Sequence, residues 1–172
     1  MNPAHINDYI PVAVIGGGPA GLMAAESMAQ GGARVDLYDA MPSMGRKFLI
    51  AGKGGLHLTH SEPMPQFLEH YGPSRGRIEA WLRDFGPDEV RLWAAELGVE
   101  TFVGTSRRVF PLGMKTAPLL HVWLERLRSA GVKFHPRHRW LGWKSDNSLL
   151  FSTPDGEISI RANVLVLALG GV

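Results

Sequence analysis

The strongest constraint on the fold is a glycine-rich turn between two short apolar segments near the N-terminus. Residues 12–15 are apolar, and a second apolar segment, residues 33–38, ends at an acid, Asp39. Between them lie a segment of helical pattern and the turn that precedes it, Gly16-Gly17-Gly18-Pro19-Ala20-Gly21. This order and spacing are typical of the β-α-β unit that binds a dinucleotide. The sequence therefore predicts a Rossmann-like α/β fold with a parallel sheet.

Three of the glycines have distinct predicted roles in such a turn. Gly16 lets the chain turn sharply out of the first strand, and Gly18, which has no Cβ, lets the backbone approach a pyrophosphate. Gly21 lets the helix lie close to the sheet. The phosphates would meet the N-terminal end of the helix that begins near Pro19, and Asp39 would accept hydrogen bonds from ribose hydroxyls. The alternative is an ordinary β-α-β unit whose glycine turn binds nothing.

Composition excludes several other classes of site. The chain has 172 residues, of which 45% are hydrophobic and 20% charged, with a net charge of +2. The basic residues are dispersed, so we expect no nucleic acid partner. Because there is no cysteine, a disulfide framework, a cysteine zinc site and a redox-active thiol pair are excluded. The N-terminus lacks a signal-peptide pattern and no apolar run approaches a membrane span, which predicts a cytoplasmic protein without a membrane partner.

Periodicity and turn residues predict the remaining elements. Helices are expected over residues 19–30, 74–85, 87–97 and 117–130, and strands over 100–103, 108–110 and 132–135. Residues 41–60 are irregular and glycine-rich, which is typical of a functional loop. Hairpin turn signals then predict a three-stranded antiparallel meander over residues 140–143, 148–152 and 157–160. A continuous apolar strand, residues 164–169, precedes Gly170-Gly171.

That last strand should be covered by neighbouring elements. We therefore expect the chain to be the truncated, N-terminal part of a larger protein. An exposed apolar edge at this strand would favour self-association, and a cofactor cleft beside it would be open on one side. On that expectation the chain alone would bind the cofactor poorly and be inactive as an enzyme.

Three blocks of sequence resemble a known family. The N-terminal glycine turn, the interrupting meander and the closing RANVLVLALGG resemble the flavoproteins with two dinucleotide-binding domains. More narrowly, GRKFLIAGKGGLHLTH, FVGTSRRVFP and LLHVWLERLRSAGV resemble the BaiN-like, or aminoacetone-oxidase-type, bacterial NAD(P)/FAD-dependent oxidoreductases. The resemblance covers essentially the whole chain. It implies that residues 1–172 are the N-terminal part of an FAD/NAD(P)-binding domain whose substrate domain and last flavin-contacting segment are absent.

The resemblance implies FAD as the resident cofactor, with NAD(P)H as a candidate electron donor. It also assigns cofactor-binding residues outside the turn: Asp39, Ala40, Arg46, Lys47, Ala168 and Gly170. His57 stands where relatives carry Asn, which puts the chemistry of the flavin loop in doubt. His121 stands where many carry Arg, which affects only a helix surface.

Other residues allow two interpretations each. Lys53, in a Gly-Lys-Gly loop without the P-loop spacing, lines the cofactor cleft or belongs to a plain surface turn. His57 and His60 are either acid/base groups beside a flavin or loop histidines bonded to backbone. Their spacing matches no metal-ligand pattern, so no metal site is expected. Helical spacing predicts that Trp81, Trp93 and Trp123 are core residues. Trp140 and Trp143 should point to opposite faces if their strand is regular, and one of them is a candidate to cover the nucleotide or the missing domain. Arg107 and Arg108 contact an anionic substrate or a nearby carboxylate.

The leading hypothesis is an FAD-dependent oxidoreductase that acts on a small molecule, with substrate and catalytic residues unassigned. An RNA-modification-linked flavoprotein is an alternative, which the dispersed basic charge disfavours. A second alternative is a nucleotide-binding fragment without catalytic activity.

Overall fold

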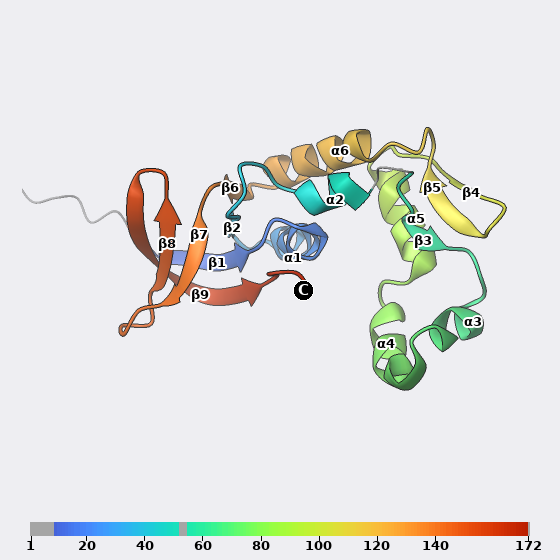
Figure 1. The fold of residues 1–172 in the computed structure, drawn as a ribbon, viewed down its shortest axis with the longest axis horizontal. Coiled ribbons are helices and arrows are strands. Elements are labelled where there is room, and N and C mark those ends of the chain that lie inside the picture. The colour runs from blue at the N-terminus through green and yellow to red at the C-terminus, as the bar shows by residue number, and fades with distance from the viewer. Residues whose placement is uncertain (1–8, 52–54, 172) are drawn as a thin grey trace, which may run out of the picture. The chain divides into compact units, whose positions relative to one another are not determined.

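The computed structural model describes residues 9–51 and 55–171, which divide into two compact units (Figure 1). Unit 1 contains residues 9–48 and 124–171, and unit 2 contains residues 49–123. The helices α2 (Arg46–Ala51) and α6 (Thr116–Ser129) carry the chain between them. Unit 2 is therefore an insertion within the domain predicted over residues 1–172.

Unit 1 is built on a six-stranded sheet in the order β6-β2-β1-β9-β8-β7. Its parallel part comprises β6 (Lys133–His135), β2 (Val35–Tyr38), β1 (Tyr9–Ile15) and part of β9 (Gly156–Leu167). The strands β7 (Arg139–Trp143) and β8 (Leu149–Thr153) extend it as an antiparallel meander with β9. This confirms the predicted α/β fold with a parallel sheet and a three-stranded meander.

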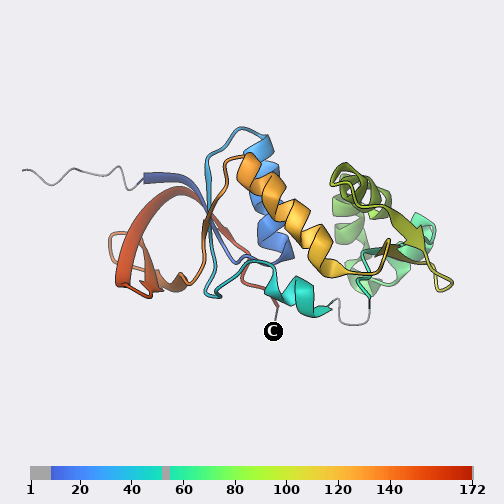
Figure 2. The ribbon, with the colours of Figure 1, turned by 90° about the horizontal axis from the view of Figure 1, so that it is seen from above.

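One prediction about the strands is wrong, because the third meander strand and the terminal apolar strand are a single element. Figure 2 shows β9 as one long, curved strand. Its first part pairs antiparallel with β8 and its second part pairs parallel with β1, where Val12 lies opposite Val164. The predicted burial of the terminal strand is also only partial: Val164 and Leu167 are 49% and 46% exposed.

The β-α-β unit at the N-terminus forms as its sequence predicts. The helix α1 (Pro19–Gln30) begins after Gly18 and ends at Gly31, and Gly32 follows with a φ of +84°. It contacts β1 and β2 and buries Leu22 and Ala25 completely. The whole of β2 is buried, so Asp36 and Tyr38 are covered as well as Val35 and Leu37.

Unit 2 combines short helices with a separate three-stranded antiparallel sheet in the order β3-β5-β4. The strands are β3 (Thr59–His60), β4 (Thr101–Val103) and β5 (Arg108–Pro111). The helical elements are α3 (Met64–Glu69), the 3-10 turn Gly72–Ser74, α4 (Arg75–Leu82) and α5 (Pro87–Glu96). Neither β3 nor α3 was predicted, because each is too short to show a period.

The tryptophans test the predicted core. Trp93 and Trp123 are buried, and their rings meet edge to face at 4.8 Å. Trp81 is 63% exposed, so its assignment to the core is wrong. Opposite faces were expected of Trp140 and Trp143 on a regular strand, but the register of β7 shifts between Trp140 and Gly142. The two side chains therefore lie together, with their ring centroids 4.7 Å apart.

Two further observations concern earlier expectations. Lys53 and its neighbouring glycines lie outside the described residues, so the structure says nothing of their role. Across residues 9–51 and 55–171, every helix is too short or too polar to cross a membrane.

Candidate functional site

The glycine turn is held by close packing of backbone on backbone. Gly16 has a φ of +111°, and a Cβ there would lie 2.1 Å from the carbonyl oxygen of Ala168. A Cβ on Gly21 would lie 1.7 Å from the carbonyl oxygen of Gly16. These two positions therefore need glycine for the contact of β1, α1 and the end of β9, whether or not a ligand is bound.

Gly18 is different, because no heavy atom lies within 4 Å of the position of a Cβ there. It precedes α1 with an extended backbone, and the first turn of the helix has neither a side-chain cap nor an acidic residue. The helix therefore presents uncapped N–H groups and the positive end of its dipole to this open space. An anionic group can approach the backbone here.

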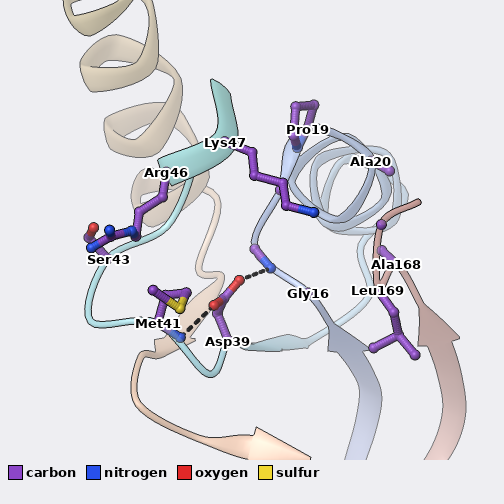
Figure 3. Close-up of a pocket in the computed structure, with 13 residues that line it drawn as sticks. Gly16, Pro19, Ala20, Asp39, Met41, Ser43, Arg46, Lys47, Ala168 and Leu169 are labelled. Carbon is purple, nitrogen blue, oxygen red and sulfur yellow. Dashed lines mark hydrogen bonds between the residues drawn. The ribbon is translucent and has the colours of Figure 1, made fainter. Parts of the chain in front are cut away.

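Asp39 follows β2 and faces the same turn (Figure 3). Its Oδ2 accepts a hydrogen bond from the Gly17 N–H at 2.6 Å, and its Oδ1 accepts one from the Met41 N–H at 2.7 Å. These bonds fix the orientation of the carboxylate. Because each carboxylate oxygen has two lone pairs, both oxygens can still accept a hydrogen bond from a ligand hydroxyl.

A cavity of about 230 Å³ opens over the turn. In Figure 3 the Lys47 side chain reaches toward the glycine turn, whereas Arg46 points the other way, toward Ser43. Lys47 Nζ also lies 3.3 Å from the position of a Cβ on Gly170. The cavity is lined by Gly16, Gly17, Gly18, Pro19, Ala20, Asp39, Met41, Ser43, Arg46, Lys47, Ala168, Leu169 and Gly170.

A second cavity, of about 320 Å³, adjoins the first. The two share Gly16, Asp39 and Leu169. Three residues at the start of the meander, His138, Arg139 and Trp140, form one wall of the second cavity. Ile15 and Ala40 complete its lining. One cavity is thus next to the helix N-terminus and a lysine, and the other has aromatic walls.

Most of the predicted site residues come together here. All of them except Ala40 and Gly21 line the first cavity, and Ala40 lines the second. Gly21 lines neither, since its part is the packing of α1 against the turn. Trp140, one of the two tryptophans considered as a cover for the nucleotide, lines the second cavity. Sequence reasoning missed the sequence neighbours of predicted residues and two residues that no motif marks: Ile15, Met41, Ser43 and Leu169, and His138 and Arg139.

The contacts of His60 favour its interpretation as a loop histidine bonded to backbone. His60 Nε2 lies 3.0 Å from the carbonyl oxygen of Ser106, and its Nδ1 accepts the N–H of Glu62 at 3.3 Å. Both ring nitrogens therefore contact backbone groups of their own unit. His57 is exposed and its ring lies 6.1 Å from that of Phe110.

Solved structures with this fold are larger than the chain. Thermovibrio ammonificans THI4 has a TM-score of 0.62 at 17% identity, over 95% of this chain and 58% of that chain. A 3-ketosteroid-delta4-(5alpha)-dehydrogenase from Rhodococcus jostii RHA1 has a TM-score of 0.68 at 18% identity, over 95% and 46%. The quinol fumarate reductase FrdA of E. coli has a TM-score of 0.71 at 17% identity, over 95% and 33%. The chain thus spans about half the length of these structures or less, and identities this low show the fold alone.

A family model gives the more specific result. The model described as the HI0933-like protein Rossmann domain matches residues 10–172, which is nearly the whole chain. This agrees with the class of flavoprotein that the sequence blocks resemble. The chain belongs to the HI0933-like family, a family of FAD-dependent oxidoreductases, through its Rossmann domain.

Proposed function

We propose that the two adjoining cavities of unit 1 bind the ADP half of FAD, and that the chain is the FAD-binding part of an FAD-dependent oxidoreductase. The observation that carries this proposal is the open space at Gly18, in a cavity that is also lined by the Asp39 carboxylate and the Lys47 side chain. A dinucleotide needs both features: backbone N–H groups that bind its anionic diphosphate, and a fixed carboxylate that accepts hydrogen bonds from its ribose hydroxyls.

The diphosphate would bind at the glycine turn. The uncapped N–H groups at the start of α1 donate to its oxygens, and the open space at Gly18 admits it. Lys47 supplies a positive charge from the opposite side of the cavity. Arg46, which points toward Ser43, contributes to the field of the site rather than to a direct contact.

The adenosine would occupy the rest of the site. Asp39 accepts hydrogen bonds from the ribose hydroxyls, and its negative charge disfavours a nucleotide with a 2′-phosphate. The adenine ring would enter the second cavity, against Trp140 and His138. The aromatic wall suits a flat ring. Because Asp39 lines both cavities, a ribose bound to it can be joined to an adenine in the second cavity and to a diphosphate in the first.

When bound, FAD supplies hydride or single-electron transfer at its isoalloxazine ring. The residues of unit 1 would bind and orient the cofactor through its adenosine and diphosphate. NAD(P)H as electron donor, a small-molecule substrate and a cytoplasmic location belong to this proposal. Self-association through the exposed apolar residues of β9 also stays a prediction.

Titration of the purified chain with FAD and with ADP tests the site. Gly18→Val should abolish binding, because a branched side chain fills the space for the diphosphate. It should leave the fold intact, since the backbone at Gly18 is extended, with φ −80° and ψ −177°. Asp39→Ala should weaken ADP by about 10- to 150-fold, which corresponds to about 1.5–3 kcal/mol for a charged hydrogen-bond acceptor.

Asp155→Asn, at the tip of the β8–β9 hairpin, is the matched acid control and should bind like the wild type. Unchanged affinity in both Gly18→Val and Asp39→Ala would refute the assignment of this site. Anaerobic bleaching of bound flavin by NADH or NADPH tests the electron donor separately. Because the chain alone is expected to be inactive, this test uses the protein extended by the substrate domain and the flavin-contacting segment that the resemblance implies. Such a protein that binds FAD and is reduced by neither nucleotide would contradict only that part of the proposal.

A further inference from the structure

Asp36 and His135 form a hydrogen bond beneath the proposed adenosine site. Asp36 lies within β2 and is 5% exposed. His135 ends the neighbouring strand β6, and its Nε2 lies 2.6 Å from Asp36 Oδ1. An ionised carboxylate only accepts hydrogen bonds, so Nε2 carries the proton and donates it. The His135 side chain is 30% exposed, and the ring is tied to the sheet by a buried acceptor.

Tyr38 holds the same imidazole from one face. The two rings stack with centroids 4.4 Å apart and an interplanar angle of 12°. Burial, together with the charge of Asp36, raises the pKa of Tyr38 far above its usual value, so the phenol stays neutral. Asp36 and Tyr38 thus fix both the direction and the plane of the His135 ring.

The residues that follow His135 are bonded to the loop that carries Asp39. The Asp39 N–H donates to the His135 carbonyl at 3.1 Å, and the His138 N–H donates to the Asp39 carbonyl at 2.8 Å. The Arg137 N–H donates to the Met41 carbonyl at 2.9 Å. The wall of the second cavity and the predicted ribose acceptor are therefore held to each other, with His135 at the start of this ladder.

We propose that His135 is a positioning residue for the adenosine site: its hydrogen bond to Asp36 fixes the loop that sets His138 against Asp39. This rests on the proposed function. His135 lines neither cavity, so it acts through the loop and not by contact with a ligand. Loss of the hydrogen bond would free the end of β6 and let the wall move relative to Asp39, at the cost of adenosine affinity.

The test measures the Kd of ADP by calorimetry for four proteins: wild type, His135→Leu, His135→Gln and Lys133→Gln. His135→Leu should weaken ADP about tenfold, in line with loss of a charged hydrogen bond. His135→Gln, whose amide can still donate to Asp36, should stay within about threefold of wild type. Lys133 is an exposed residue of the same strand that lies opposite Asp36 in the pairing of β6 with β2. Lys133→Gln should therefore bind ADP normally.

Rescue by glutamine separates the two roles, because Gln keeps a donor for Asp36 but loses the aromatic ring that packs on Tyr38. If His135 served only as a packed ring, His135→Gln would bind ADP as weakly as His135→Leu. Where His135→Leu fails to fold, His135→Phe takes its place, because a phenyl ring can still stack on Tyr38 but cannot donate to Asp36. This variant should weaken ADP at least threefold. His135→Leu or His135→Phe within twofold of wild type, or His135→Gln as weak as His135→Leu, would overturn the inference. Wild type that binds no ADP would instead overturn the proposed function.

Discussion

Removal of Arg126 should destabilise unit 1 because it leaves a carboxylate buried. Glu26, in the middle of α1, is 3% exposed. Arg126, near the end of α6, reaches it with two guanidinium nitrogens, and the Nε–Oε1 distance is 2.6 Å. Gln30 donates to the same Oε1 at 3.4 Å. Arg126→Met keeps much of the apolar stem and removes the charge.

The size of the effect follows from the burial of Glu26. Breaking a buried ion pair by removing one partner costs about 3–5 kcal/mol, because the other charge stays in a medium that solvates it badly. Gln30 still donates to Glu26, so we expect the lower end, about 3 kcal/mol. With a urea m-value of about 2 kcal/mol/M, the midpoint of urea unfolding should fall by about 1.5 M.

Two further variants make this measurement specific. Glu125→Gln breaks the exposed pair with Arg128 on the same helix and should cost less than about 1 kcal/mol. Glu26→Gln combined with Arg126→Met should recover part of the loss, because the buried charge is gone. A midpoint for Arg126→Met within about 0.5 M of wild type, or no recovery in the double variant, would refute the reasoning.

Two other predictions concern stability. Trp81→Ala should change the unfolding free energy by less than about 1 kcal/mol, whereas Trp123→Ala, at a side chain 2% exposed, should cost about 3–5 kcal/mol; equal losses in chemical denaturation would contradict the observed burial. The hydrogen bonds from Ser148 hold the pKa of Asp146 well below its usual range, so the carboxylate contributes stability above its unfolded pKa of about 4 and loses it as the pH falls further. The Tm difference between wild type and Asp146→Asn should therefore be present at pH 7 and shrink below about pH 4, and a difference independent of pH would show that the charge is not involved.

The first β-α-β unit could be predicted in detail because local chemistry decides its boundaries. Proline at the first helical position and the Gly31-Gly32 pair give α1 the bounds that the structure has. Gly21 is fixed by its contact with Gly16 inside this β-α-β unit, whereas Gly16 is fixed by the backbone of Ala168, which is distant in sequence. Where residues close in sequence also contact one another in the fold, the sequence pattern is enough to predict the element and its boundaries.

Features that depend on distant contacts could not be predicted in this way. Helical spacing places Trp81 on a face but does not say whether another element covers that face. The shift of register in β7, which brings Trp143 onto Trp140, has no single marker residue. His138 and Arg139 enter the site only because their loop bonds to the one after β2.

The continuous strand β9 has a consequence for the order in which the protein folds. Its second part forms the centre of the sheet by pairing with β1, so that Val12 meets Val164 across a separation of about 150 residues. During synthesis β1 cannot pair with β9 until residues 161–167 have been made. The glycine turn, whose shape depends on Ala168, can therefore be completed only after β9 has been made, and until then β1 exposes an unpaired edge that chaperones or neighbouring chains can engage.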